Sequence, residues 1–288
     1  MKRLIFYTAI FALAIFSWSC NEDDLNSDSI FDTSEVERNA FEKWLLQNYT
    51  YPYNIDFKYR LEDIESDMDY TLTPADMDKS IKLAKLVKYC WLEAYDEVAG
   101  IVFTRTFVPK TVHLIGSAAY NTDGTMILGT AEGGLKITLY LVNSLQVDRD
   151  FLNYFYFKTM HHEFAHILHQ TKNYDPDFET ISEGNYIGND WIYSSDTEAR
   201  QAGFVTPYAQ SEPNEDFVES IAVYVTNSPE FWDALLEEAG EEGAAIILQK
   251  FEIVRNYLQE TWSIDIDKLR EVVQRRSGEL DKLDLDNL

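Results

Sequence analysis

A run of histidines constrains this chain more than any other feature, because its spacing needs a helix. Residues 161–170 read HHEFAHILHQ and hold four of the five histidines of the chain. The run contains the pattern HExxH at His162, Glu163 and His166. Residues four apart on an α-helix lie one turn above each other on one face, so both imidazoles can point at one ion. Residues 151–170 contain no proline or glycine, which predicts that the motif lies inside a helix.

This spacing is typical of a zinc site that activates water. His162 and His166 would bind the ion, and Glu163 would lie beside it. A carboxylate in that place can accept a proton from water that zinc has made acidic. The chemistry indicated is attack of water on a carbonyl group. The alternative is a helix in which the histidines only pack, since short patterns of this kind also arise by chance.

Zinc in a hydrolase usually takes three protein ligands, so the motif needs one more donor. His169 shares the helical face of the motif, but seven residues past His162 it lies roughly 10 Å along the axis. No glycine occurs between His166 and Gly184 to turn the chain back. We therefore expect His169 to pack, or to hydrogen-bond to a ligand, and not to bind the ion itself.

A second candidate region for the third ligand is residues 214–219, which read NEDFVE. Glu215 and Glu219 lie one turn apart there on a predicted helix. A glutamate from this helix would complete a site of two histidines and one glutamate. Asp216 is an adjacent alternative.

With these two segments the chain resembles the gluzincin metallopeptidases, whose third ligand is a glutamate on a helix after the HExxH helix. More narrowly, it resembles the zinc-binding metallopeptidase lipoproteins of Bacteroidetes, which are associated with TonB-dependent import. The resemblance rests on HEFAHILHQ, on TPYAQSEPNEDFVE at 206–219, and on the start of the chain. Its active-site pattern is similar to that of anthrax lethal factor protease, in which a tyrosine lies seven positions before the ligand glutamate.

The resemblance implies roles for residues of the second segment. Tyr208 and Glu215 have the same separation as that tyrosine and glutamate. Glu215 is thereby assigned as the third ligand and Tyr208 as the residue that stabilises the oxyanion. Asp216 stays an alternative ligand, and Glu219 is expected to orient a histidine.

The resemblance also implies a fold and an activity. We expect an α+β fold, a zincin-like metallopeptidase domain with a small mixed sheet, an active-site helix and a helical C-terminal part. One Zn²⁺ would serve hydrolysis of peptide bonds at the cell surface, with Glu163 as general base. Two alternatives stay open: a surface binding component of a nutrient import complex with a structural or vestigial zinc site, and a zinc hydrolase of a non-peptide amide or ester.

The N-terminus is typical of an export signal. Lys2 and Arg3 precede an apolar stretch at 4–16 that is too short to span a membrane. The segment resembles a bacterial lipoprotein signal that ends before Cys20, and the acidic run after it resembles that of surface-exposed Bacteroidetes lipoproteins. We expect a signal peptide at 1–19, a flexible acidic tether at 20–32, and a protein lipid-anchored through Cys20 to the outer membrane and exposed at the cell surface. An ordinary secreted protein is the alternative.

The charge of the chain excludes some partners. A net charge of −26 makes nucleic acid and anionic membranes poor partners on electrostatic grounds. The expected partners are a peptide or protein substrate and, from the resemblance, a TonB-dependent outer-membrane import system.

For the remaining chain, residues 33–288, we expect a single domain whose N-terminal part is helical to about residue 105. Strands are expected at 111–117 and 134–141, and the second is expected to be an edge strand along which an extended peptide could lie. Hydrophobic periodicity and capping patterns predict helices at 34–47, 78–98, 151–170, 195–203, 217–225, 229–238 and 244–259, with a charged tail from 266.

Overall fold

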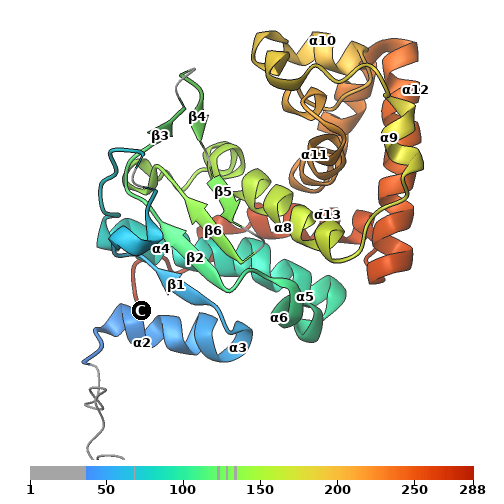
Figure 1. The fold of residues 1–288 in the computed structure, drawn as a ribbon. Coiled ribbons are helices and arrows are strands. Elements are labelled where there is room, and N and C mark those ends of the chain that lie inside the picture. The colour runs from blue at the N-terminus through green and yellow to red at the C-terminus, as the bar shows by residue number, and fades with distance from the viewer. Residues whose placement is uncertain (1–36, 68, 122–123, 128, 133–134) are drawn as a thin grey trace, which may run out of the picture. The chain divides into compact units, whose positions relative to one another are not determined.

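The fold is mostly helical and contains one small mixed sheet that helices flank (Figure 1). The computed structural model describes residues 37–288, except 68, 122–123, 128 and 133–134. Residues 39–288 form one compact unit. The expected signal peptide and acidic tether lie outside the described residues. None of the helices in the described part has the length and apolar character needed to cross a membrane.

The sheet has four strands in the order β1, β2, β6, β5. Their bounds are Asp56–Lys58, Thr111–Leu114, Lys136–Leu139 and Gly129–Glu132 respectively. The first three run parallel, and β5 runs antiparallel to β6. β2 and β6 are almost wholly buried, as parallel strands covered on both faces usually are. The expected α+β class with a small mixed sheet is confirmed.

The expected edge strand is wrong. Within the predicted range, Lys136–Leu139 form β6, which pairs with β2 on one side and with β5 on the other. The edge strand on this side of the sheet is β5, which has only four residues. Its sequence, GTAE, lacks the alternating apolar pattern by which a strand is recognised, and that is why it was missed. Two short strands, β3 (Ala119–Tyr120) and β4 (Met126–Ile127), form a separate hairpin.

Helices of the N-terminal part pack against the sheet. The first helical run joins α2 (Ala40–Leu45), the π-helical η1 (Leu46–Thr50) and α3 (Tyr51–Tyr53). A capping box of Asn39 and Glu42 starts α2 at Ala40, and the predicted start at residue 34 lies outside the described residues. The second run covers the expected 78–98 through α4 (Met77–Val87), η3 (Lys88–Leu92) and α5 (Glu93–Ala99). It ends at Gly100, whose φ of 85° favours glycine, and α6 (Ile101–Phe107) follows.

The helix of the histidine motif follows the sheet in sequence. It runs through α7 (Arg149–Leu152), η5 (Asn153–Phe157) and α8 (Lys158–Thr171), which confirms the predicted helix at 151–170. The apolar face of α8 packs on the second helical run: the Phe164 ring lies edge-on to Trp91 and Tyr95, with centroids 5.6 and 4.8 Å away. The opposite, histidine-bearing face is therefore left to meet the C-terminal part.

Helices make up the C-terminal part, as expected. The principal ones are α9 (Asp177–Ile181), α10 (Asp196–Gln201), α11 (Pro213–Thr226), α12 (Pro229–Trp262) and α13 (Ile266–Ser277). Short 3₁₀ turns lie at η2 (Asp63–Glu65), η4 (Val142–Ser144), η6 (Gly188–Tyr193), η7 (Tyr208–Gln210) and η8 (Leu280–Lys282). The two helices predicted at 229–238 and 244–259 are the two parts of α12, which Gly240 interrupts with a φ of 69°. α11 packs directly on α8 (Figure 1).

Candidate metal centre

Three side chains from α8 and α11 converge on one point. The Nε2 atoms of His162 and His166 lie 3.2 Å apart. Oε2 of Glu215 lies 3.0 Å from the first and 3.3 Å from the second. With zinc–ligand bonds of about 2.0–2.1 Å, two corners of a tetrahedral site lie about 3.3 Å apart. The three atoms are thus spaced as the ligands of one zinc ion would be, and the residues fit the metal.

The imidazoles of His162 and His166 are each oriented by a hydrogen bond at Nδ1, the ring nitrogen that faces away from the cluster. Nδ1 of His162 donates to Oε1 of Glu219 at 2.9 Å, since a carboxylate can only accept. Nδ1 of His166 lies 3.0 Å from Nε2 of His169. A histidine that donates from Nδ1 keeps a lone pair on Nε2 when it is neutral. Lone pairs of two imidazoles and one carboxylate then face one another, an arrangement that needs a cation.

The pKa shifts of His162 and Glu215 also indicate that this site favours a positive charge. Burial would lower the pKa of His162, but hydrogen bonds to Glu215 and Glu219 outweigh it and raise the pKa to about 9. Burial would raise the pKa of Glu215, yet its bonds to His162 and His166 lower it to about 2. A proton on His162 partly fills the place that a metal ion would take.

Glu219 is itself fixed on three sides. It is buried, and its Oε2 accepts from Thr206 Oγ1 at 2.6 Å and lies 2.8 Å from Lys158 Nζ. Burial alone would raise the pKa of Glu219, but Lys158 and His162 hold it well below its usual value. The sequence prediction placed Glu219 behind a histidine but missed Lys158 and Thr206. Lys158 carried a readable signal, because it lies one turn before His162 on the same helical face.

The other histidines of the run lie outside the three-residue cluster. His169 is buried beside His166, and burial, followed by the neighbouring His166, lowers its pKa to about 4. Its position behind His166 matches the expectation that it would hydrogen-bond to a ligand. His161 faces the opposite side of α8, where Tyr95 OH lies 3.0 Å from its Nδ1. Burial lowers the pKa of His161 to about 3.

Asp216, the alternative ligand, points away from the cluster. Its Oδ2 lies 2.6 Å from Nζ of Lys250 on α12 and accepts from the Tyr186 hydroxyl at 3.0 Å. Asp216 and Lys250 are each about 1% exposed. This buried ion pair attaches the first turn of α11 to α12, next to Glu215. The pairing was not predicted from the sequence, because an aspartate and a lysine 34 residues apart share no local pattern.

A hollow of about 410 Å³ opens over the three ligand atoms. Glu163 and Tyr208 both line it, so the structure brings together all five residues predicted for the site. The Tyr208 ring lies against His162 at 5.8 Å between centroids and edge-on to Trp191 at 5.1 Å. Burial, then the charge of Glu215, raises the pKa of Tyr208, so its hydroxyl stays protonated and can donate a hydrogen bond.

The edge strand β5 forms one border of this hollow. Gly129, its first residue, lines the hollow. A Cβ at Gly129 would meet Cγ2 of Thr159 at 2.6 Å, which shows how closely β5 approaches α8. Among the strands of the described residues, β5 pairs with β6 alone, so its second edge offers backbone groups with which an extended peptide could pair.

Comparisons with known proteins agree with this geometry. A family model described as "Putative zinc-binding metallo-peptidase" matches residues 34–267. A crystal structure described as a putative zinc-binding metallo-peptidase from Bacteroides caccae ATCC 43185 shares 53% sequence identity with this chain. The match covers 90% of this chain and 99% of that one, with a TM-score of 0.77. No curated protein matches the chain at a significant level.

Proposed function

The chain belongs to the family of putative zinc-binding metallo-peptidases, and from this premise we propose that it is a zinc-dependent peptidase of the gluzincin type with a zincin-like fold. The observation that supports it most is the convergence of His162, His166 and Glu215 at tetrahedral spacing. These three residues would hold one Zn²⁺. A bound zinc ion would polarise a substrate carbonyl and lower the pKa of the attacking water to near 7.

The residues around the ligands supply the proton transfers. The Glu163 carboxylate takes the proton from the attacking water and then delivers it to the leaving amine, as a general base and then a general acid. The Tyr208 hydroxyl donates a hydrogen bond to the oxygen that becomes negative as the carbonyl is attacked. Trp191 supports the Tyr208 ring from the side. Glu219 and His169 orient the two histidines.

The hollow favours this function over a structural zinc site. A structural site is closed by four protein ligands, whereas a catalytic site keeps one position open. Here three ligand atoms border an open hollow that also holds a carboxylate and a phenol. A binding component with a vestigial site would need neither Glu163 nor Tyr208.

Turnover of a diverse peptide library tests the proposal. Zinc-loaded protein should cleave a subset of the peptides, a chelator should stop cleavage, and added zinc should restore it. Absence of cleavage in a library of wide sequence coverage would contradict the peptidase function. It would favour the binding component or the hydrolase of a non-peptide amide or ester.

We further propose that this activity is placed at the cell surface by a lipid on Cys20, beside a TonB-dependent import system. The support is the sequence of residues 1–24, with its basic start, short apolar stretch, cysteine and acidic run. In cells fed a labelled fatty acid, the wild-type protein should take up the label and Cys20→Ala should not. Equal labelling of both proteins would contradict the anchor.

A further inference from the structure

A second recess lies beside the catalytic hollow and shares part of its wall. It has a volume of about 320 Å³, close to the lower limit of about 300 Å³ for ligand pockets. Ile167 and Gln170 of α8 border both cavities. Together with Glu163 they occupy positions i, i+4 and i+7 of one helical face. The face of α8 that carries the proposed general base therefore continues directly into the recess.

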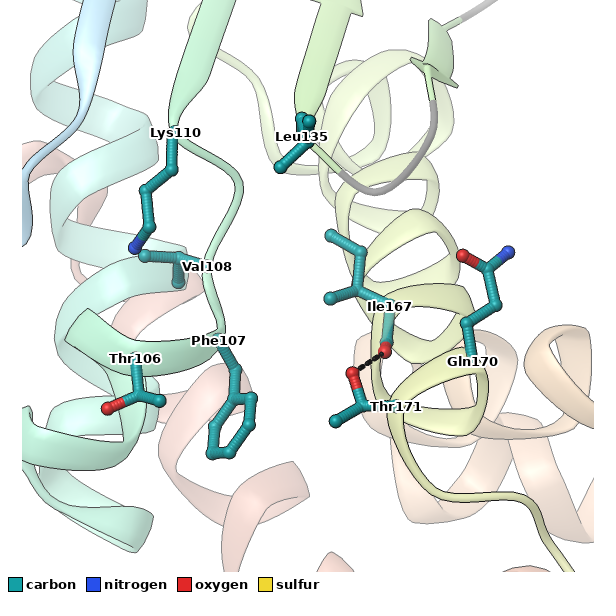
Figure 2. A pocket seen from close by; sticks show the side chains of 8 residues that line it. All are labelled: Thr106, Phe107, Val108, Lys110, Leu135, Ile167, Gln170 and Thr171. Atoms are coloured by element: carbon teal, nitrogen blue, oxygen red, sulfur yellow. Dashed lines mark hydrogen bonds between the residues drawn. The ribbon is translucent and has the colours of Figure 1, made fainter. Parts of the chain in front are cut away.

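Figure 2 shows the two walls of this recess. Phe107 and Val108, from the end of α6, lie on one side together with Lys110, and the residues of α8 lie on the other. Leu135 lies above them, and its carbonyl accepts from the backbone N–H of Lys110 at 2.8 Å. Apolar side chains thus form half of the lining, and the other half consists of two threonines, one cation and one amide.

The cation in the recess is Lys110, and none of the other residues that line the recess carries a negative charge. Its Nζ donates to the carbonyl of Arg105 at 2.6 Å, and it forms no ion pair with a carboxylate of the described residues. Burial lowers the pKa of Lys110, and no described anion counteracts this effect. An ammonium group has three donors, so two remain for a ligand. Across the recess, the Gln170 amide takes part in no hydrogen bond with the described part of the chain.

We infer that this recess is a side-chain subsite of the substrate cleft and that it takes a glutamate side chain, with apolar walls around the methylene groups and Lys110 at the carboxylate. The inference rests on the proposed peptidase function. Charge complementarity selects the occupant, because an apolar side chain would leave the ammonium with the Arg105 carbonyl and no anionic partner. A basic side chain would add repulsion.

The subsite lies within reach of the reacting carbonyl. At a rise of 1.5 Å per residue, Ile167 and Gln170 lie roughly 6 and 10 Å along α8 from Glu163. An extended peptide advances about 3.3 Å per residue. The glutamate would therefore be about two to three residues from the scissile bond.

The preference for glutamate cannot come from the overall charge. A net charge of −26 repels acidic peptides, so the long-range field acts against this preference. A measured preference for glutamate would thus indicate a local cation in the subsite. Lys110→Met removes the charge and keeps the length of the side chain, and Lys110→Glu reverses the charge. Lys282→Glu, at an exposed ion pair with Glu279, makes the same change in net charge elsewhere and is the matched control.

Cleavage of matched peptides tests the inference first. The substrates are alanine hexapeptides in which one position, scanned along the chain, is Glu, Gln, Leu or Lys. Zinc-loaded wild type should cleave the Glu peptide roughly tenfold faster than the Gln peptide at one position, a ratio typical of one charge-assisted hydrogen bond. Lys110→Met should abolish the ratio, Lys110→Glu should favour Lys, and Lys282→Glu should match wild type. Cleavage without a Glu preference, or a preference that survives in Lys110→Met, would overturn the inference.

Binding of the same peptides separates this inference from the proposed function. Fluorescein-labelled hexapeptides are titrated against zinc-loaded Glu163→Gln by anisotropy, alone and combined with each Lys110 substitution. A roughly tenfold lower Kd for Glu than for Gln, lost with Lys110→Met, would support the subsite even if the wild type cleaved nothing. In that case only the peptidase function would fail. Equal Kd values for Glu and Gln at every position would overturn the subsite.

Discussion

Nδ1 of His162 lies 2.9 Å from Oε1 of Glu219, and this hydrogen bond joins the histidine helix α8 to α11. Because α11 also carries Glu215, the same helix supplies one proposed ligand and orients another. Lys158 reaches back from α8 to the second oxygen of Glu219 at 2.8 Å. The packing of the two helices and the geometry of the site therefore depend on one buried carboxylate.

Removal of that carboxylate should weaken zinc binding. A residue that orients a metal-binding histidine typically contributes a factor of about 10–100 in metal affinity, so Glu219→Ala should raise the zinc Kd by that amount. Glu219→Gln keeps an acceptor oxygen and should cost less. Competition with a chromophoric chelator measures both values. Glu260→Ala, on an exposed part of α12, is the control, and an unchanged Kd for Glu219→Ala would contradict the role.

Glu163→Gln should retain zinc and lose hydrolysis. The amide cannot accept the proton of the attacking water, and general acid–base groups contribute about 10²–10⁴-fold to rate. We expect kcat to fall by at least about 100-fold with no change in zinc content, measured by peptide turnover and by metal analysis of the purified protein. Glu183→Gln, an exposed glutamate outside the hollow, is the control. Turnover near wild type would remove Glu163 from the mechanism.

Local spacing explains why so much of the site could be predicted. His162, His166 and Glu163 share one helix without proline or glycine, so their arrangement followed from helical geometry alone. Glu215 came from a second short segment, where the resemblance supplied what spacing could not. Two strands and the helical C-terminal part followed from periodicity and turn residues, and the small mixed sheet was an implication of the resemblance.

Contacts between distant segments explain what could not be predicted. β5 becomes the edge strand only through its pairing with β6. Its four residues lack the alternation of apolar and polar side chains from which a strand is predicted. In the sequence, nothing distinguishes Lys250 from the other lysines of amphipathic helices. Its ion pair with Asp216 forms only when α12 packs against α11. The recess at Lys110 likewise forms only when the end of α6 comes to face α8.

Metal-free protein should lose stability as the pH rises from about 6.5 to about 9. Glu215 and Glu219 raise the pKa of His162 to about 9, against about 6.5 in an unfolded chain. The folded state then binds the proton more tightly, so this contribution is complete below about pH 6.5 and is lost as the pH passes about 9. At 1.36 kcal/mol per pKa unit, it is about 3 kcal/mol.

Urea unfolding of chelator-treated protein at several pH values measures this loss. In Glu215→Gln, one of the two carboxylates that raise the pKa is removed, so the free energy of unfolding should fall less between pH 6.5 and 9. The apparent zinc affinity should instead increase over the same range, because the proton on His162 competes with the metal. An equal fall in wild type and variant would show that other groups cause it.

The buried pair of Lys250 and Asp216 should stabilise the first turn of α11. Lys250→Met would leave the Asp216 carboxylate buried without its cation, which typically costs about 3–5 kcal/mol. Tyr186 would still donate to that carboxylate, but a neutral donor cannot replace the charge. We expect a decrease of this size in the free energy of urea unfolding.

A double variant separates loss of the pair from loss of packing around it. In Lys250→Met with Asp216→Asn, neither partner is charged, so most of the lost stability should return. The exposed pair of Lys268 and Glu271, 2.9 Å apart, is the control, and Lys268→Met should cost less than about 1 kcal/mol. If the double variant were as unstable as Lys250→Met, the cost would lie in the packing of the lysine stem. The charge of Asp216 would then contribute little to holding α11 beside the site.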